Sequence, residues 1–296
     1  MLVNLKEIMD LAERNQYAVG SFNTPNLESL EAVIQAAEEL ALPVIIQFAQ
    51  CHEPWIPLEL IGPIMVEAAK KAKVPVCVHL DHGETLEYLQ SALDMGFTSI
   101  MYDGSVLPYE ENLENTKKAV AMAAKTGASV EAELGSMGRR ESGDVAEGAE
   151  AADAAATGAD DETKIYTDPV RAGIFVKETG IDALACSFGT THGIYLTEPK
   201  LDFGVVEGVR AQADNIPVVM HGGSGVSKED YRKAIKAGVR KINYFTYMDK
   251  SGGNAAAEYV KSVQPGAPLF FSSVMMAARE AMKENVKEAM KMFALR

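Results

Sequence analysis

Three of the five histidines in this 296-residue chain follow short apolar segments, and each directly precedes a glycine. They are His82 in VHLDHG, His192 in FGTTHG and His221 in MHGGSG. Any one of them alone would be an ordinary polar residue beside a turn. Together they form a set that catalytic zinc sites use, in which three protein ligands leave one coordination position open. Their shared position predicts a metal site, whereas His79 lies earlier in its segment and is expected to have a supporting or core role.

Other polar groups follow similar apolar segments. Asp81 stands beside His82, and Glu131 and Glu133 end the segment SVEAE. Glycine-rich HGGSG and the segment KINYFT lie where backbone N–H groups and hydroxyls could hold a phosphate. A glycine-rich turn alone is weak support for such a site, because glycine is common in turns.

The segments that must position these residues alternate along the whole chain between strand-like and helix-like spacing of their apolar residues. Short β-type runs are separated by segments with helical spacing of apolar residues. Eight strands are predicted at 18–22, 44–48, 76–80, 99–101, 129–133, 183–187, 218–220 and 241–244. Helices are predicted at 27–40, 58–73, 86–94, 110–126, 168–179, 203–213, 227–237 and 274–295. This α/β pattern predicts a (β/α)8 TIM barrel that forms a single domain over residues 1–296. A doubly wound sheet is disfavoured because no GxGxxG follows the first strand.

Composition restricts the partners. The formal net charge is -14, from 42 acidic and 28 basic residues, which disfavours nucleic acid and anionic membranes. The three cysteines lack CxxC spacing, and there is neither a signal-like start nor a long apolar run. We therefore expect a cytoplasmic protein that binds a small molecule.

The stretch at about 138–164 is rich in Ala, Gly and acidic residues, and it is predicted to be a mobile lid or a solvated insertion.

Several motifs in this order carry a resemblance to a known family: FNTPNLE, VHLDHG, MYDGS, VEAELG, YTDP, FGTTHGIY and HGGSGV. The chain resembles the class II, metal-dependent ketose-bisphosphate aldolases of the fructose- and tagatose-bisphosphate type. The resemblance implies a lyase that cleaves a ketose 1-phosphate or 1,6-bisphosphate to dihydroxyacetone phosphate and an aldehyde. It also implies Zn2+, a monovalent cation such as Na+ or K+, and a homodimer or homotetramer.

The resemblance also assigns roles to residues. It implies that His82, His192 and His221 bind zinc, that Glu133 belongs to an auxiliary metal site, and that Asp81 is the acid/base for the C4 hydroxyl. Glu141 of the lid would exchange the C3 proton. The residues that match substrate-binding positions are Asn23, Gly193, Gly222, Ser224, Asn243 and Thr246.

The match fails where many relatives recognise a second phosphate. Many relatives have a lysine where this chain has Leu196, a small or acidic residue where it has Phe245, and an arginine where it has Asp249. Arg139 and Arg140 could instead contact the distal end of the substrate. The alternatives are therefore an aldolase for a non-bisphosphate sugar or sugar-acid 1-phosphate, a metal-dependent barrel hydrolase, and a regulatory barrel that binds a sugar phosphate without catalysis.

Overall fold

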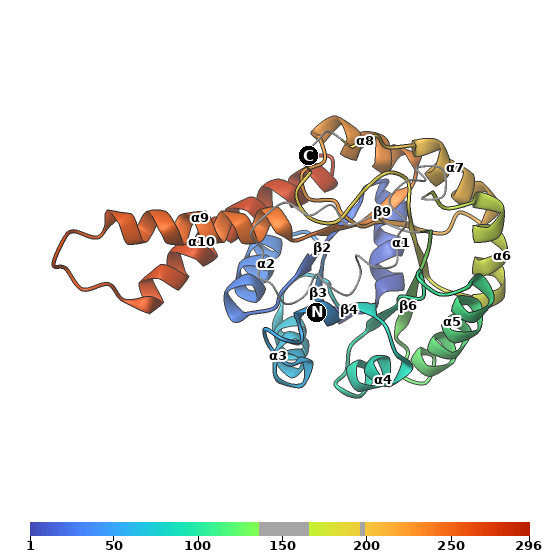
Figure 1. Cartoon of the computed structure of the whole chain (residues 1–296), viewed down its shortest axis with the longest axis horizontal. Coiled ribbons are helices and arrows are strands. Elements are labelled where there is room, and N and C mark those ends of the chain that lie inside the picture. The colour runs from blue at the N-terminus through green and yellow to red at the C-terminus, as the bar shows by residue number, and fades with distance from the viewer. Residues whose placement is uncertain (136–165, 196–198) are drawn as a thin grey trace.

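The computed structural model describes residues 1–135, 166–195 and 199–296 of one chain, whose core is a closed parallel barrel (Figure 1). Its strands pair in the order β4-β3-β2-β9-β8-β7-β6-β5, and a β4–β5 pairing closes the ring. The strands are β2 (Val19–Asn23), β3 (Val44–Ala49), β4 (Val76–Gly83), β5 (Ser99–Tyr102), β6 (Ser129–Leu134), β7 (Ala183–Cys186), β8 (Val218–Met220) and β9 (Val239–Tyr244). The predicted single-domain TIM barrel is confirmed, and a short β1 (Leu2–Val3) adds to the start of β4.

A ring of helices surrounds the barrel (Figure 1). It contains α2 (Leu27–Leu40), α3 (Leu58–Lys71), α4 (Leu86–Asp94), α5 (Tyr109–Ala123), α6 (Pro169–Thr179), α7 (Phe203–Gln212) and α8 (Lys228–Ala237). Several begin at a side-chain cap, because Asn26, Thr85, Asp168 and Ser227 each accept a hydrogen bond from a backbone N–H of the first turn. These caps fix where each helix leaves the loop that follows a strand.

Helix α1 (Leu5–Asn15) closes the N-terminal end of the barrel. Its apolar face packs on residues of the strands in a separate core cluster that includes Leu5, Ile8, Val19, Ile45 and Cys77. Since this end is filled by apolar side chains, the polar residues at the opposite, C-terminal ends of the strands form the mouth.

Helices α9 (Thr246–Ser262) and α10 (Phe271–Phe293) form an arm that projects away from the barrel (Figure 1). The predicted C-terminal helix is therefore present and begins three residues earlier than expected, whereas α9 was not predicted. Phe293 anchors α10 to the barrel, with its ring 5.0 Å from that of Tyr231 and 5.9 Å from that of Tyr244.

Some predicted features lie outside the described residues. These are the lid at about 138–164, with Arg139, Arg140 and Glu141, and the departure at Leu196. Within the described parts of the chain, no helix has the length and apolar character needed to cross a membrane.

Candidate metal and active site

The three predicted histidines meet at the C-terminal mouth of the barrel. Each offers a ring nitrogen, and these nitrogens lie within 4.8 Å of one another. The ring of His82 is centred 4.7 Å from that of His221 and 5.2 Å from that of His192. The residues come from the end of β4 and from the loops after β7 and β8, so the barrel brings together the three positions that the sequence indicated.

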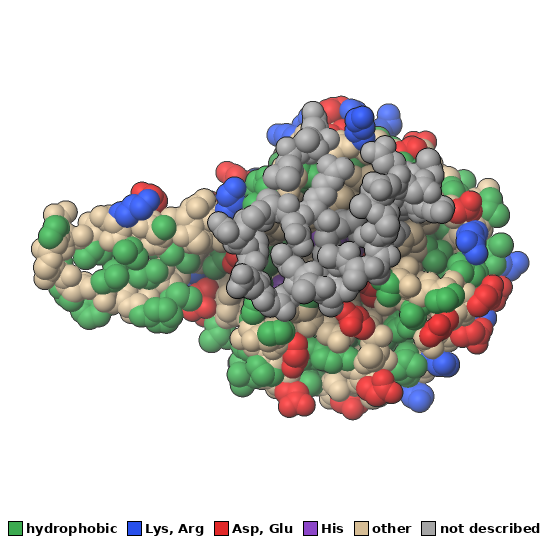
Figure 2. Space-filling model, viewed as in Figure 1, with side chains coloured by type: hydrophobic (Ala, Val, Ile, Leu, Met, Phe, Trp, Pro, Cys, Tyr) green, Lys and Arg blue, Asp and Glu red, His purple; other side chains and the backbone are tan. Residues whose placement is uncertain are grey.

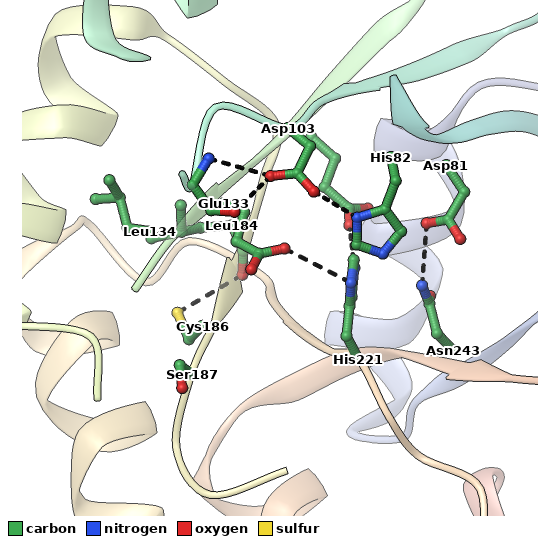
Figure 3. Close-up of polar contacts among 12 residues, drawn as sticks. Asp81, His82, Asp103, Glu133, Leu134, Leu184, Cys186, Ser187, His221 and Asn243 are labelled. Carbon is green, nitrogen blue, oxygen red and sulfur yellow. Dashed lines mark hydrogen bonds and ion pairs between the residues drawn. The ribbon is translucent and has the colours of Figure 1, made fainter. Parts of the chain in front are cut away.

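A β-bulge at the end of β4 allows two consecutive residues to face this mouth. Neighbouring residues of a regular strand point to opposite faces. His82 has a positive φ of 47°, and the pairing with β5 shifts register between Leu80 and Gly83. The bulge turns the His82 ring toward His221 while Asp81 still reaches Asn243 (Figure 3).

Hydrogen bonds leave one nitrogen of each of two histidines for a metal. His82 Nδ1 lies 2.6 Å from Asp103 Oδ2, so Nε2 remains, and His221 Nε2 lies 2.9 Å from Glu131 Oε1, so Nδ1 remains. His221 Nδ1 and Glu133 Oε2 are 3.7 Å apart, and both are buried without a hydrogen-bond partner among the described residues. Buried polar atoms are rarely left unpaired, and a metal cation would satisfy both atoms.

The surrounding charge also suits a cation. Burial raises the pKa of Glu133 well above its usual range, and the nearby Asp103 raises it further. Burial opposes the protonation of His82, but the carboxylates of Asp81 and Asp103 outweigh it and raise the pKa of His82 to about 10. His82, Asp103 and Glu133 form a second group with metal-ligand spacing. Sequence reasoning assigned no role to Asp103, although its position directly after β5 in MYDGS was the same signal that identified the histidines.

A buried ion pair inside the barrel holds the Glu131 carboxylate that contacts His221. Lys241 Nζ lies 2.8 Å from Glu131 Oε2, and both side chains are fully buried. His79 contacts this pair through Nε2, 3.4 Å from Lys241 Nζ, and its Nδ1 lies 2.8 Å from Ser99 Oγ. Burial, followed by the Lys241 charge, lowers the pKa of His79 to about 3, so His79 is neutral. His79 thus lies in the core, as predicted, while the part played by Lys241 was missed.

Amide groups hold the Asp81 carboxylate in one orientation. Asn243 Nδ2 donates to Oδ1 at 3.1 Å, and Gln47 Nε2 donates to Oδ2 at 2.9 Å and to Asn23 Oδ1 at 2.6 Å. Burial opposes ionisation of Asp81, but His82 and Lys241 outweigh it and lower its pKa. The predicted residues Asp81, Asn23 and Asn243 therefore form one network, whose centre, Gln47, was not predicted.

The glycine loops lie after β7 and β8 and are tied to each other. Gly222 has a φ of 61°, and a Cβ there would lie 2.3 Å from Thr191 O. The Tyr195 hydroxyl donates to Gly222 O at 2.8 Å and accepts from Thr191 N at 3.0 Å. The predicted phosphate-binding residues all lie at these strand ends: Gly193, Gly222 and Ser224 in the two loops, Asn243 in β9 and Thr246 at the start of α9.

A parallel (β/α)8 barrel with clustered histidines and carboxylates at its C-terminal mouth has the architecture of a metal-dependent barrel enzyme. The sequence model of the family described as "Fructose-bisphosphate aldolase class-II" matches residues 3–296. The chain belongs to this family and is an aldolase, a lyase. Membership implies a divalent metal, and the donor set described above fits one.

Individual relatives match this chain over nearly its full length. The chain is 38% identical to fructose-bisphosphate aldolase of Staphylococcus aureus over 297 residues, covering 99% of this chain and 97% of that protein. It is 37% identical to fructose-bisphosphate aldolase of Staphylococcus epidermidis, with the same coverage. Among solved structures, the YdjI aldolase of Escherichia coli K12 has a TM-score of 0.83 and 35% identity, covering 99% of this chain and 97% of that one.

The Glu131–His221 contact gives a prediction about metal affinity. Glu131→Gln keeps the shape of the side chain but removes the charge that orients His221, so we expect metal affinity to fall by about 10- to 100-fold. Competition with a coloured chelator would measure this. Glu59→Gln, at an exposed position of α3, is the matched control and should bind metal like the parent protein. Equal affinity in the Glu131→Gln variant would show that His221 needs no such support.

Proposed function

We propose that this chain is a zinc-dependent aldolase that cleaves a ketose 1-phosphate or 1,6-bisphosphate to dihydroxyacetone phosphate and an aldehyde. The observation that carries the proposal is the histidine cluster at the mouth with the fixed carboxylate of Asp81 beside it. His82, His192 and His221 would hold the metal, with Glu133 at an auxiliary position. When bound, the metal supplies Lewis-acid stabilisation of the negative charge that develops on the C2 oxygen.

Asp81 is proposed to act as the acid/base at C4. In cleavage its carboxylate takes the proton of the C4 hydroxyl, the C3–C4 bond breaks, and its electron pair passes to the dihydroxyacetone phosphate half while the C4 carbonyl forms. The two amide donors, Asn243 and Gln47, orient Asp81 for this step, while the charges of His82 and Lys241 lower its pKa and so favour the ionised carboxylate. Glu141, which lies outside the described residues, is proposed to return a proton to C3.

The C1 phosphate is assigned to the strand ends β7 to β9. Gly193, Gly222, Ser224 and Thr246 lie there, and backbone N–H groups of such loops and of a helix N-terminus bind anions. Asn243 and Asn23 would contact the carbon chain next to Asp81. A monovalent cation, Na+ or K+, beside the phosphate is part of the same proposal.

The assembly is proposed to be a homodimer or homotetramer that works in the cytoplasm. Figure 2 shows hydrophobic side chains along the projecting arm, where Phe270 and Phe271 are 61% and 77% exposed. Exposed apolar residues gathered in one place are typical of contact surfaces. None of the three cysteines forms a disulfide, which suits a reducing compartment.

Removal of the metal should abolish cleavage of ketose phosphates. Treatment with a chelator is expected to reduce the release of dihydroxyacetone phosphate, measured by a coupled assay, to background, and zinc or cobalt should restore it. Full activity of the metal-free protein, or inactivation by borohydride in the presence of substrate, would instead indicate a Schiff base and contradict the proposal.

Replacement of Asp81 should separate catalysis from metal binding. We expect Asp81→Ala to retain the metal and to lose cleavage by roughly 100-fold or more, because a positioned acid/base group contributes about that much. Asp94→Ala, at an exposed position of α4, is the control. Metal content by atomic emission and kcat from the coupled assay decide the outcome, and an active Asp81→Ala variant would refute the assignment.

The arm gives a prediction about assembly. The double change Phe270→Ser and Phe271→Ser is expected to produce a smaller species in light scattering than the parent protein, because it removes two exposed aromatic side chains. Val106→Ser, at a residue that is 70% exposed elsewhere on the surface, should leave the mass unchanged. An identical mass for all three proteins would exclude the tip of the arm from the contact.

A further inference from the structure

Three rings form a wall at one side of the mouth. We call His52, Trp55 and Phe245 the aromatic wall. The His52 ring stacks on Trp55, with centroids 4.6 Å apart and an interplanar angle of 21°, and it lies 5.1 Å from the Phe245 ring. Trp55 is 52% exposed, so its ring faces solvent, whereas His52 is buried beneath the Trp55 ring.

The wall stands over the C-terminal end of β2. His52 ends the 3-10 helix η1 (Gln50–His52) that follows β3, and Phe245 follows β9, while β2 lies between these strands. Ala49 of β3 pairs in register with Asp81, and Asn243 of β9 donates to Asp81. The wall therefore borders the Asp81 side of the mouth.

This is where the aldehyde half of the substrate must lie if the proposed function holds. The C1 phosphate is assigned to the loops after β7 to β9, the metal to the histidines, and C4 to Asp81. On the β5 and β6 side of Asp81 stand the half-buried carboxylate of Asp103 and the buried carboxylate of Glu133. The carbon chain beyond C4 therefore extends toward β2 and β3, against the wall.

The segment that carries His52 and Trp55 is held in place on both flanks. The Gln50 side chain accepts from Glu84 N at 2.9 Å. The Glu53 carboxylate accepts from Leu58 N at 3.1 Å and from the Tyr88 hydroxyl. Because these bonds tie the segment after β3 to the loop after β4, to α3 and to α4, the His52–Trp55 part of the wall is formed before any ligand arrives, which lowers the entropic cost of binding.

The rings of the wall are uncharged, and unpaired hydrogen-bonding atoms are buried at this side of the barrel. His52 is only 5% exposed and Thr24 is fully buried. Even so, His52 Nδ1 and Thr24 Oγ1 have no hydrogen-bond partner among the described residues. Burial, opposed by Asp81, lowers the pKa of His52 to about 4, so the imidazole is uncharged near neutral pH.

We propose that the aromatic wall binds an uncharged, polyhydroxylated tail of the aldehyde half, so that the enzyme prefers ketose 1-phosphates to ketose 1,6-bisphosphates. The C–H faces of such a tail pack on the rings, and its hydroxyls pair with His52 Nδ1 and Thr24 Oγ1. A terminal phosphate dianion would meet these neutral rings, because none of the three residues of the wall carries a positive charge to pair with it. This inference rests on the proposed aldolase function.

The test uses the metal-loaded, full-length enzyme in the condensation direction. Dihydroxyacetone phosphate is offered with D- or L-glyceraldehyde, with four- and five-carbon aldoses, and with glyceraldehyde 3-phosphate, and kcat/KM is measured for each aldehyde. Exchange of the C3 proton of dihydroxyacetone phosphate with solvent deuterium, followed by NMR, reports on the aldolase function without any aldehyde. We expect at least one uncharged aldehyde to exceed glyceraldehyde 3-phosphate.

Variants of the wall sharpen the test. Trp55→Ala is expected to lower kcat/KM for the uncharged aldehydes by about tenfold more than it lowers the exchange rate, as loss of one ring contact predicts. Trp55→Phe should recover most of this loss. Leu60→Ala, at a residue that is 60% exposed on α3, is the control for truncation of a surface side chain and should match the parent.

The outcomes are distinguishable. Normal exchange with a roughly 100-fold preference for glyceraldehyde 3-phosphate, worth about 2.7 kcal/mol, overturns this inference and leaves the aldolase function intact. Normal exchange with a Trp55→Ala loss no larger than that of Leu60→Ala also overturns it. Absence of both exchange and condensation refutes the proposed function and this inference with it.

Discussion

The ion pair between Glu131 and Lys241 is the interaction on which the arrangement of the active site depends. Both side chains are fully buried inside the barrel, and their charged atoms are 2.8 Å apart. Removal of one partner would leave an uncompensated buried charge, at a cost of about 3–5 kcal/mol. The second oxygen of Glu131 orients His221, and the Lys241 charge lowers the pKa values of both Asp81 and His79. The geometry of the mouth is therefore set by the interior of the barrel, which is more rigid than its loops.

A backbone irregularity complements this pair on the other side of the site. His82 adopts a left-handed conformation that is uncommon for residues other than glycine, and the strand pairing shifts around it. The cost of such a conformation is of order 1–3 kcal/mol and is tolerated where the surrounding structure imposes it. Here the hydrogen bond to Asp103 holds the ring in place. As a result Asp81 and His82, although adjacent in sequence, both face the same mouth, as the proposed acid/base and metal-ligand roles require.

Sequence reasoning predicted the barrel and its histidines because both leave periodic signals, an alternation of β and helical patterns and a repeated position before glycine. It missed Gln47 and Lys241, since a lone polar residue in an apolar strand does not reveal which side chain the closed barrel will place beside it. Helix α9 was missed because Gly252 and Gly253 lower helix propensity. The structure gives a reason for Gly252, where a Cβ would lie 2.9 Å from Met282 of α10, so the glycine permits close packing of the two helices.

The overall charge makes contacts within the mouth decisive for an anionic substrate. A formal charge of -14 repels phosphate on approach, but at physiological ionic strength this repulsion between exposed charges is screened beyond about 8 Å. Closer in, the side of the mouth formed by β7 to β9 offers two of the three clustered histidines, His192 and His221, together with the Gly222 loop and the N-terminus of α9 at Thr246. The end over β2 and β3 offers neutral rings. The two sides of the mouth therefore differ in polarity among the described residues. Under the proposed function, a substrate with its charge at one end would bind in a single orientation, with C4 beside Asp81.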